Sequence, residues 1–107
     1  MAYPIDHTSA WTALGDPTRR AIFERLLEQP LAVHALAEGL PVSRPAVSQH
    51  LKVLSDARLV VARREGKHRI YQVDPHGIAA LRAELQRFWD KTMAAYKAVV
   101  EQSSTKT

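Results

Sequence analysis

The sequence predicts a mainly α-helical domain that carries a small β-hairpin. In residues 8–57, apolar side chains recur every three or four positions, which is the period of helices that pack on a core. From Leu59 the pattern changes to two runs rich in β-branched and aromatic residues, separated by Gly66 and Lys67. A chain of 107 residues with 46% hydrophobic and 24% charged residues suffices for one globular domain with a small core.

Four helices are expected before the hairpin, in residues 8–14, 17–29, 33–40 and 44–57. Asp16 ahead of Pro17, and Ser43, are suited to be the N-caps of the second and fourth helices. One face of each helix is apolar and is expected to face the core. The expected core positions are Ala21, Ile22, Leu26 and Leu27 in the second helix, Val33, Leu36, Ala37 and Leu40 in the third, and Val47, Leu51 and Leu54 in the fourth.

The hairpin is expected to join strands at about 59–65 and 68–73, and it must pack on the helices because two strands alone are unstable. A long helix is expected after Asp74 and Pro75, to about Gln102, with residues 103–107 as a disordered tail and residues 1–102 as the domain. Its apolar or small residues are spaced alternately three and four positions apart, as in a helix that packs along another long helix. These residues are Ile78, Leu81, Leu85, Phe88, Thr92, Ala95 and Val99.

A helix of about 25 residues is roughly 37 Å long at 1.5 Å per residue. Four short helices offer too little surface to cover it. We therefore expect a second copy of the chain to pack against this last helix.

The positive charge of the chain is concentrated in residues 41–73. This segment holds seven basic and two acidic residues, whereas the remainder holds eight basic and nine acidic residues. The formal net charge of +4 is therefore a local patch, which is typical of a protein that binds a polyanion.

The third and fourth helices, joined by a tight turn, form a helix-turn-helix arrangement in which the second helix enters the major groove of DNA. Ser48 and Gln49 suit base edges, and Arg44 and Lys52 suit guanine edges or phosphates. The basic hairpin suits the phosphate backbone or the minor groove. For His50 we favour a supporting role over base reading. The expected DNA-binding residues are Ser43, Arg44, Pro45, Ser48, Gln49, His50 and Lys52, together with Arg63, Arg64, Lys67, His68 and Arg69 in the hairpin.

These motifs resemble those of the bacterial ArsR/SmtB winged helix-turn-helix repressors over roughly residues 11–100. The resemblance rests on DPTRR at 16–20, LAE at 36–38, SRPAVSQHLKVL at 43–54, and RREG at 63–66 before a strand that contains Tyr71. It implies a homodimer, with the first and last helices as interface, that binds an inverted-repeat operator and blocks transcription. The interface residues expected on this basis are Trp11, Leu14, Leu81, Leu85, Phe88, Trp89, Thr92, Tyr96 and Val99.

The chain departs from the metal-sensing members of that family. They carry a cysteine pair at the start of the third helix, where this chain has residues 32–34, Ala-Val-His. Asp74 and His76 match half of a second family metal site, but Arg87 and Asp90 stand at about the positions of the other half, and a cation beside Arg87 is electrostatically opposed. We therefore expect no metal and no cofactor. Autorepression without a signal, and a response to an organic ligand or partner protein, both stay open.

Other function classes are less well supported by the residues. The chain has no cysteine, no nucleophile paired with a base and no glycine-rich phosphate loop, so we expect no enzyme. No export signal or membrane span is readable, which favours the cytoplasm. A protein adaptor that uses the hairpin to bind an acidic partner, and a nonspecific DNA-binding protein, are the alternatives.

Overall fold

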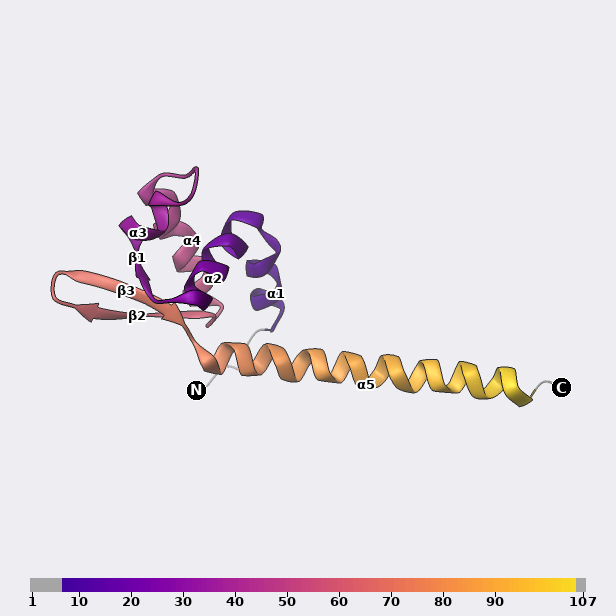
Figure 1. Cartoon of the computed structure of the whole chain (residues 1–107). Coiled ribbons are helices and arrows are strands. Elements are labelled where there is room, and N and C mark those ends of the chain that lie inside the picture. Colours follow the sequence, from indigo (N-terminus) through magenta and orange to yellow (C-terminus); the bar gives the residue numbers. More distant parts are fainter. Residues whose placement is uncertain (1–6, 106–107) are drawn as a thin grey trace.

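Residues 7–105, which the computed structural model describes, form five helices and a three-stranded sheet (Figure 1). The elements are α1 (His7–Gly15), α2 (Pro17–Glu28), β1 (Leu31–Ala32), α3 (Val33–Glu38), α4 (Arg44–Asp56), β2 (Val60–Glu65), β3 (His68–Val73) and α5 (Pro75–Thr105). This confirms the predicted fold class, a mainly α-helical domain with a small antiparallel sheet. The predicted helices of residues 8–57 are all present, and the third is two residues shorter than expected.

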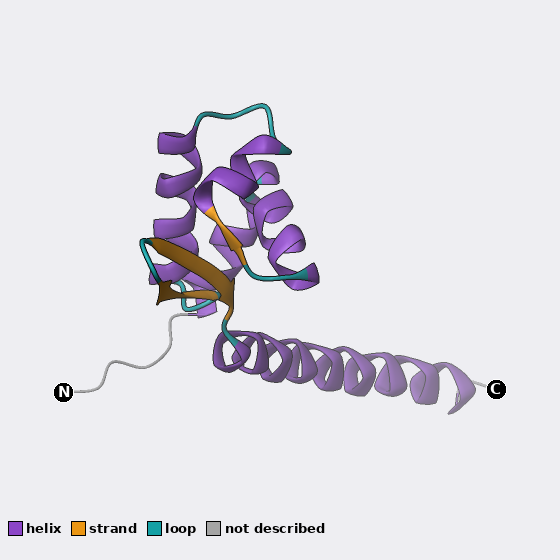
Figure 2. Ribbon diagram, turned by 60° about the vertical axis from the view of Figure 1, so that its left-hand side comes forward, coloured by secondary structure: helices purple, strands orange, loops and turns teal. Residues whose placement is uncertain are grey.

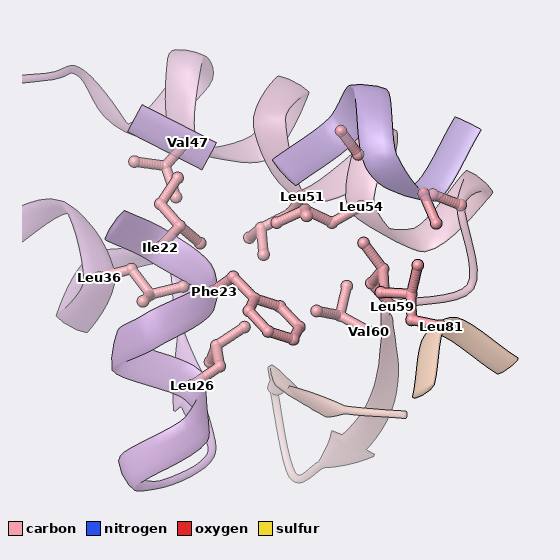
Figure 3. Close-up of a cluster of buried hydrophobic side chains, with 13 residues drawn as sticks. Ile22, Phe23, Leu26, Leu36, Val47, Leu51, Leu54, Leu59, Val60 and Leu81 are labelled. Carbon is pink, nitrogen blue, oxygen red and sulfur yellow. The ribbon is translucent and has the colours of Figure 1, made fainter. Parts of the chain in front are cut away.

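The core lies between α1, α2, α3 and α4 and is closed by the base of the hairpin (Figure 3). Its largest fully buried side chains are Ile22, Leu36, Val47, Leu51, Leu54 and Leu59. Two expectations for α2 need correction, because Leu27 is 58% exposed and Phe23 is buried. Phe23, Ile22 and Leu26 share one face of the helix, and Leu27 lies about 100° further round from Leu26.

The sheet contains one strand more than the sequence predicted. β1 pairs antiparallel with β3, Leu31 opposite Tyr71 and Ala32 opposite Ile70, which gives the strand order β1-β3-β2. Val60 at the start of β2 is buried in the core. β1 thus joins the β3 edge of the hairpin to α3, and Val60 anchors β2 in the core. The distal half of the hairpin projects as a wing (Figure 1).

α5 leaves the rest of the molecule and runs outward (Figure 1 and Figure 2). It has 31 residues and ends at Thr105. The sequence predicted a disordered tail at residues 103–107, but residues 103–105 belong to this helix. Beyond Leu81, no side chain of the described part of α5 is buried. The first turns alone therefore belong to the domain core.

The start of α5 is fixed tightly to the loop between α4 and β2. The amide of Asp74 donates a hydrogen bond to the carbonyl oxygen of Leu59 at 2.9 Å. Gly77 is buried against Arg58, and a Cβ at position 77 would overlap the carbonyl oxygen of Arg58. Arg58 itself adopts a left-handed conformation with φ 62°. Glycine is needed at position 77 because two backbones approach each other there.

Candidate nucleic-acid interface

The apolar residues of α4 fix which side of this helix faces solvent. Val47, Leu51 and Leu54 are fully buried, and the hydroxyl of Ser43 accepts a hydrogen bond from the amide of Ala46 at 3.3 Å at the helix start. The opposite face of the helix is exposed. It presents the predicted residues Arg44, Pro45, Ser48, Gln49 and Lys52.

Ser48 and Gln49 make no side-chain hydrogen bond within residues 7–105. Lys52 forms an ion pair with Asp56, with 3.3 Å between Nζ and Oδ2, and both side chains are mostly exposed. Exposed pairs of this kind contribute little to stability, so Lys52 is free to turn to another anion. The side chains of this face are therefore available to a ligand.

His50 differs from its neighbours because it is half-buried. It lies near Asp16, the N-cap of α2, whose Oδ2 accepts a hydrogen bond from the amide of Arg19 at 2.9 Å. This hydrogen bond lowers the pKa of Asp16, and the positive charges of Arg19 and His50 lower it further. His50 therefore lies close enough to the N-cap of α2 to act on it electrostatically, and its supporting role stays a prediction.

The wing gathers cations on two adjacent strands. Arg64 and Arg69 are direct partners in the β2–β3 register, and like charges in such positions repel each other. Arg63 is 3.6 Å from Glu65, whereas Arg64, Lys67 and Arg69 have no ion pair in the part of the chain that the structure describes. All five predicted wing residues, His68 included, are exposed.

A cavity of about 510 Å³ connects the wing to α4 and α3. It is lined by Ala32, Val33, His34, Arg44, Lys67, His68 and Arg69. The rings of His34 and His68 are 5.6 Å apart between centroids. Sequence reasoning did not assign His34 to the interface, because the β1–β3 pairing that brings it there was not predicted.

The predicted interface residues of α1 and α5 fall into two groups. Leu81 departs from the expectation, because it is 8% exposed and packs in the core of its own chain, and Leu14 is half-buried against the same core. The other predicted interface residues are exposed, and all but Thr92 are large hydrophobic or aromatic residues. These are Leu85, Phe88, Trp89, Thr92, Tyr96 and Val99 on α5, with Trp11 on α1.

Asp74 and His76, the weak metal candidates, have a structural role. The amide of His76 donates to Oδ1 of Asp74 at 2.9 Å, which is the hydrogen bond of a helix N-cap, and the His76 ring lies 3.3 Å from the same oxygen. Within residues 7–105, no three histidine, aspartate or glutamate side chains are grouped so that they could hold a metal ion.

No helix in the described residues is both long and apolar enough to cross a membrane. Even α5, with its 31 residues, interrupts its apolar side chains with charged ones throughout.

Comparisons with known proteins agree with this geometry. Residues 14–63 match a family of helix-turn-helix domains. Over 98 residues the chain is 57% identical to the HTH-type transcriptional regulator Rv2034 of Mycobacterium tuberculosis, with 92% of each protein covered. The fold is similar to that of an ArsR-like transcriptional regulator from Rhodococcus sp. RHA1, with a TM-score of 0.73, 32% identity, and 86% of this chain and 90% of that one covered. It is also similar to a homodimeric winged helix-turn-helix DNA-binding domain from Mycobacterium bovis, with a TM-score of 0.65, 29% identity and 81% of each chain covered.

Proposed function

The chain belongs to the ArsR/SmtB family of winged helix-turn-helix transcriptional regulators, and we propose that a homodimer of it represses transcription by binding an inverted-repeat DNA operator. Members of this family act by binding DNA and are not enzymes. The place of action is the compartment that holds bacterial DNA, the cytoplasm. A bound dimer would cover the operator and exclude the transcription machinery from it.

The observation that carries the proposal is the exposed polar face of α4 beside a wing in which Arg64, Lys67 and Arg69 have no ion pair within residues 7–105. The major groove of DNA is wide enough for an α-helix, and Gln49 has the amide that pairs with adenine in that groove. Arg44 and Lys52 flank it with positive charge on the same face. The wing then supplies phosphate contacts, which orient the protein without reading sequence.

The exposed side of α5 supports the homodimer. Large apolar side chains such as Phe88, Trp89 and Tyr96 stand in solvent along a helix that extends the molecule to 71 Å. A contiguous apolar surface of this kind is typical of a protein–protein interface. A second copy related by two-fold symmetry would cover it with the same residues.

Two-fold symmetry also sets the form of the operator. The two α4 helices would enter successive major grooves on one face of the duplex, about 34 Å apart. The operator should therefore contain two inverted half-sites whose centres are about one helical turn apart.

Selection of the purified protein against a random double-stranded DNA pool tests the proposal directly. At about 150 mM salt we expect recovery of an inverted repeat with that spacing. If each dimer contacts six to ten phosphates, the affinity for the recovered duplex should fall by roughly three to five decades between 50 and 200 mM salt.

Two other outcomes would overturn the proposal. Salt-sensitive binding without any preferred sequence would indicate a nonspecific DNA-binding protein. No binding to any duplex would leave the protein adaptor, whose wing binds an acidic protein partner, as the better account.

A further inference from the structure

We propose that the cavity between α3, the first turn of α4 and the tip of the wing binds a phosphate of the DNA backbone, and that protonated His34 and His68 hold it. DNA affinity would then depend on pH. This inference rests on the proposed function and adds a site on α3, which lies outside both the recognition helix and the wing.

The topology of the sheet brings the two histidines together. Leu31 and Ala32 of β1 stand opposite Tyr71 and Ile70 of β3, and α3 begins directly after this pair, so its first turn lies beside the start of β3 at His68. The ring centroids are accordingly 5.6 Å apart. Because β1 pairs with β3 directly before α3 begins, the proximity of His34 and His68 follows from the sheet topology.

The cavity is lined by groups that are cationic or become so on protonation. Arg44 faces it from α4, His34 from α3, and Lys67, His68 and Arg69 from the wing, whereas β1 contributes only apolar side chains. No carboxylate lines it among the described residues. The nearest acid by register is Glu65, the β2 partner of His68, and Arg63 lies 3.6 Å from its carboxylate.

This arrangement suits a phosphate diester. Arginine and protonated histidine donate charge-assisted hydrogen bonds to phosphate oxygens, which are stronger than neutral ones. Arg44 stands at the start of the helix proposed to enter the major groove, so a backbone strand that borders this groove would pass the cavity. A free phosphate ion could bind the same side chains, and the NMR experiment below distinguishes it from DNA as the ligand.

The direction in which pH changes DNA affinity follows from the proposal that the histidines bind phosphate in their protonated form. Histidine ordinarily has a pKa of about 6.5, so an imidazole gains positive charge below neutral pH. A phosphate that binds the protonated form raises the histidine pKa in the complex. The added affinity is then fully present below the pKa of the free protein and is lost as the pH rises through the pKa of the complex.

The experiment measures the affinity of the selected duplex at about pH 8 and pH 6, at constant ionic strength. If each histidine pKa rises by about one unit on binding, affinity should increase about sixfold per histidine, or roughly 35- to 40-fold for the pair. H34Q and H68Q should each remove one of these factors, and the double variant should remove both. H76Q, at an exposed histidine of α5 outside the cavity, should keep the full response.

A second readout follows the histidine ring resonances by NMR. We expect the ring resonances of His34 and His68 to shift when the duplex is added and those of His76 to stay in place. Inorganic phosphate alone should produce these shifts only weakly. If inorganic phosphate shifts both rings while the duplex does not, the cavity serves a free phosphate ligand and the inference is wrong.

The remaining outcomes separate the inference from the proposed function. If wild-type protein binds its operator and the double variant retains the wild-type pH response, the histidines hold no phosphate and the repressor function stands. If wild-type protein binds no duplex at either pH, the proposed function fails and the phosphate site fails with it.

Discussion

At the scale of single residues, α4 separates side chains that hold the fold from side chains that are free. Leu51 is fully buried, and its neighbour Gln49 is exposed without a side-chain hydrogen bond in residues 7–105. The side-chain amide of Gln49, beside Arg44 and Lys52, makes no hydrogen bond in residues 7–105 that would stabilise the fold. Its expected contribution is to the discrimination between DNA sequences.

Gln49→Ala should reduce the preference of the protein for its operator over random DNA. A good side-chain contact to a base edge is worth about 1–3 kcal/mol of discrimination, so the specificity ratio should fall by roughly five- to 150-fold. Binding to random DNA should change little, because phosphate contacts supply it. Fluorescence anisotropy with both duplexes measures the ratio, and equal losses on both would contradict base reading by Gln49.

Asp16 gives a prediction about acid stability. Its pKa is lowered in the folded state by the hydrogen bond from the Arg19 amide. The stability that this ionised cap contributes is therefore present above the ordinary aspartate pKa and is lost as the pH falls through the lowered folded value. Asp16→Asn keeps a cap oxygen that does not titrate, so stability should depend less steeply on pH in this acid range. Urea unfolding at a series of acid pH values checks it, and an unchanged pH slope would show that Asp16 does not contribute.

At the scale of elements, the wing carries a charge arrangement that a stable free hairpin would not favour. Arg64 and Arg69 face each other across β2 and β3, and neither has an ion pair in the described structure. Like charges directly opposite in a sheet are destabilising. A polyanion between the two guanidinium groups would remove this repulsion, which favours the wing as a phosphate contact.

Arg64→Ala should therefore weaken DNA binding without lowering the stability of the protein. In the free protein, loss of the repulsion should leave stability unchanged or raise it by about 0.2–1 kcal/mol. Binding to operator and random DNA should weaken alike, and the slope of log K against log salt should fall by about 0.9 for each lost phosphate contact. Arg63→Ala is the matched control, because Arg63 already lies beside Glu65 and should contribute less. If the salt slope of the Arg64 variant equals that of wild type, the residue touches no phosphate.

The elements also show what the sequence could predict. The helices of residues 8–57 and the hairpin follow from local patterns, namely the caps Asp16 and Ser43 and the change of period at Leu59. β1 has only two residues, and its pairing with β3 joins segments about 40 positions apart, so no local pattern reveals it. The association of His34 with the wing was missed for this reason. The polar face of α4 could be predicted because helical spacing alone determines it.

At the scale of the whole molecule, α5 divides into a part that belongs to the domain and a part that projects. Leu81 is buried in the core, whereas Leu85, one turn further, is exposed. The heptad spacing predicted one continuous interface along α5, because apolar residues have the same spacing whether they pack against their own chain or against a second copy. Gly77 holds the helix start against Arg58, so the direction of α5 is fixed relative to the recognition helix α4. A dimer built on α5 would therefore fix the distance between two recognition helices.

Leu85→Asp should convert the homodimer into a monomer. Dimer formation would bury this side chain against the apolar surface of the partner, and an unpaired carboxylate is costly to bury there. The monomer should stay folded, because Leu85 is 56% exposed and lies outside the core. Analytical ultracentrifugation gives the oligomeric state, and circular dichroism checks that the helices are retained.

Leu27→Asp is the matched control for that variant. Leu27 is 58% exposed, slightly more than Leu85, but it lies on α2, which contributes no residue to the predicted interface. The control should remain dimeric and bind the inverted repeat like wild type, whereas the Leu85 variant should bind the full operator no more tightly than a single half-site. The second half-site adds affinity only when the two recognition helices are linked, because linkage makes the second contact intramolecular. A Leu85 variant that remains dimeric would show that the exposed face of α5 is not the dimer interface, and the spacing predicted for the operator would then lose its structural basis.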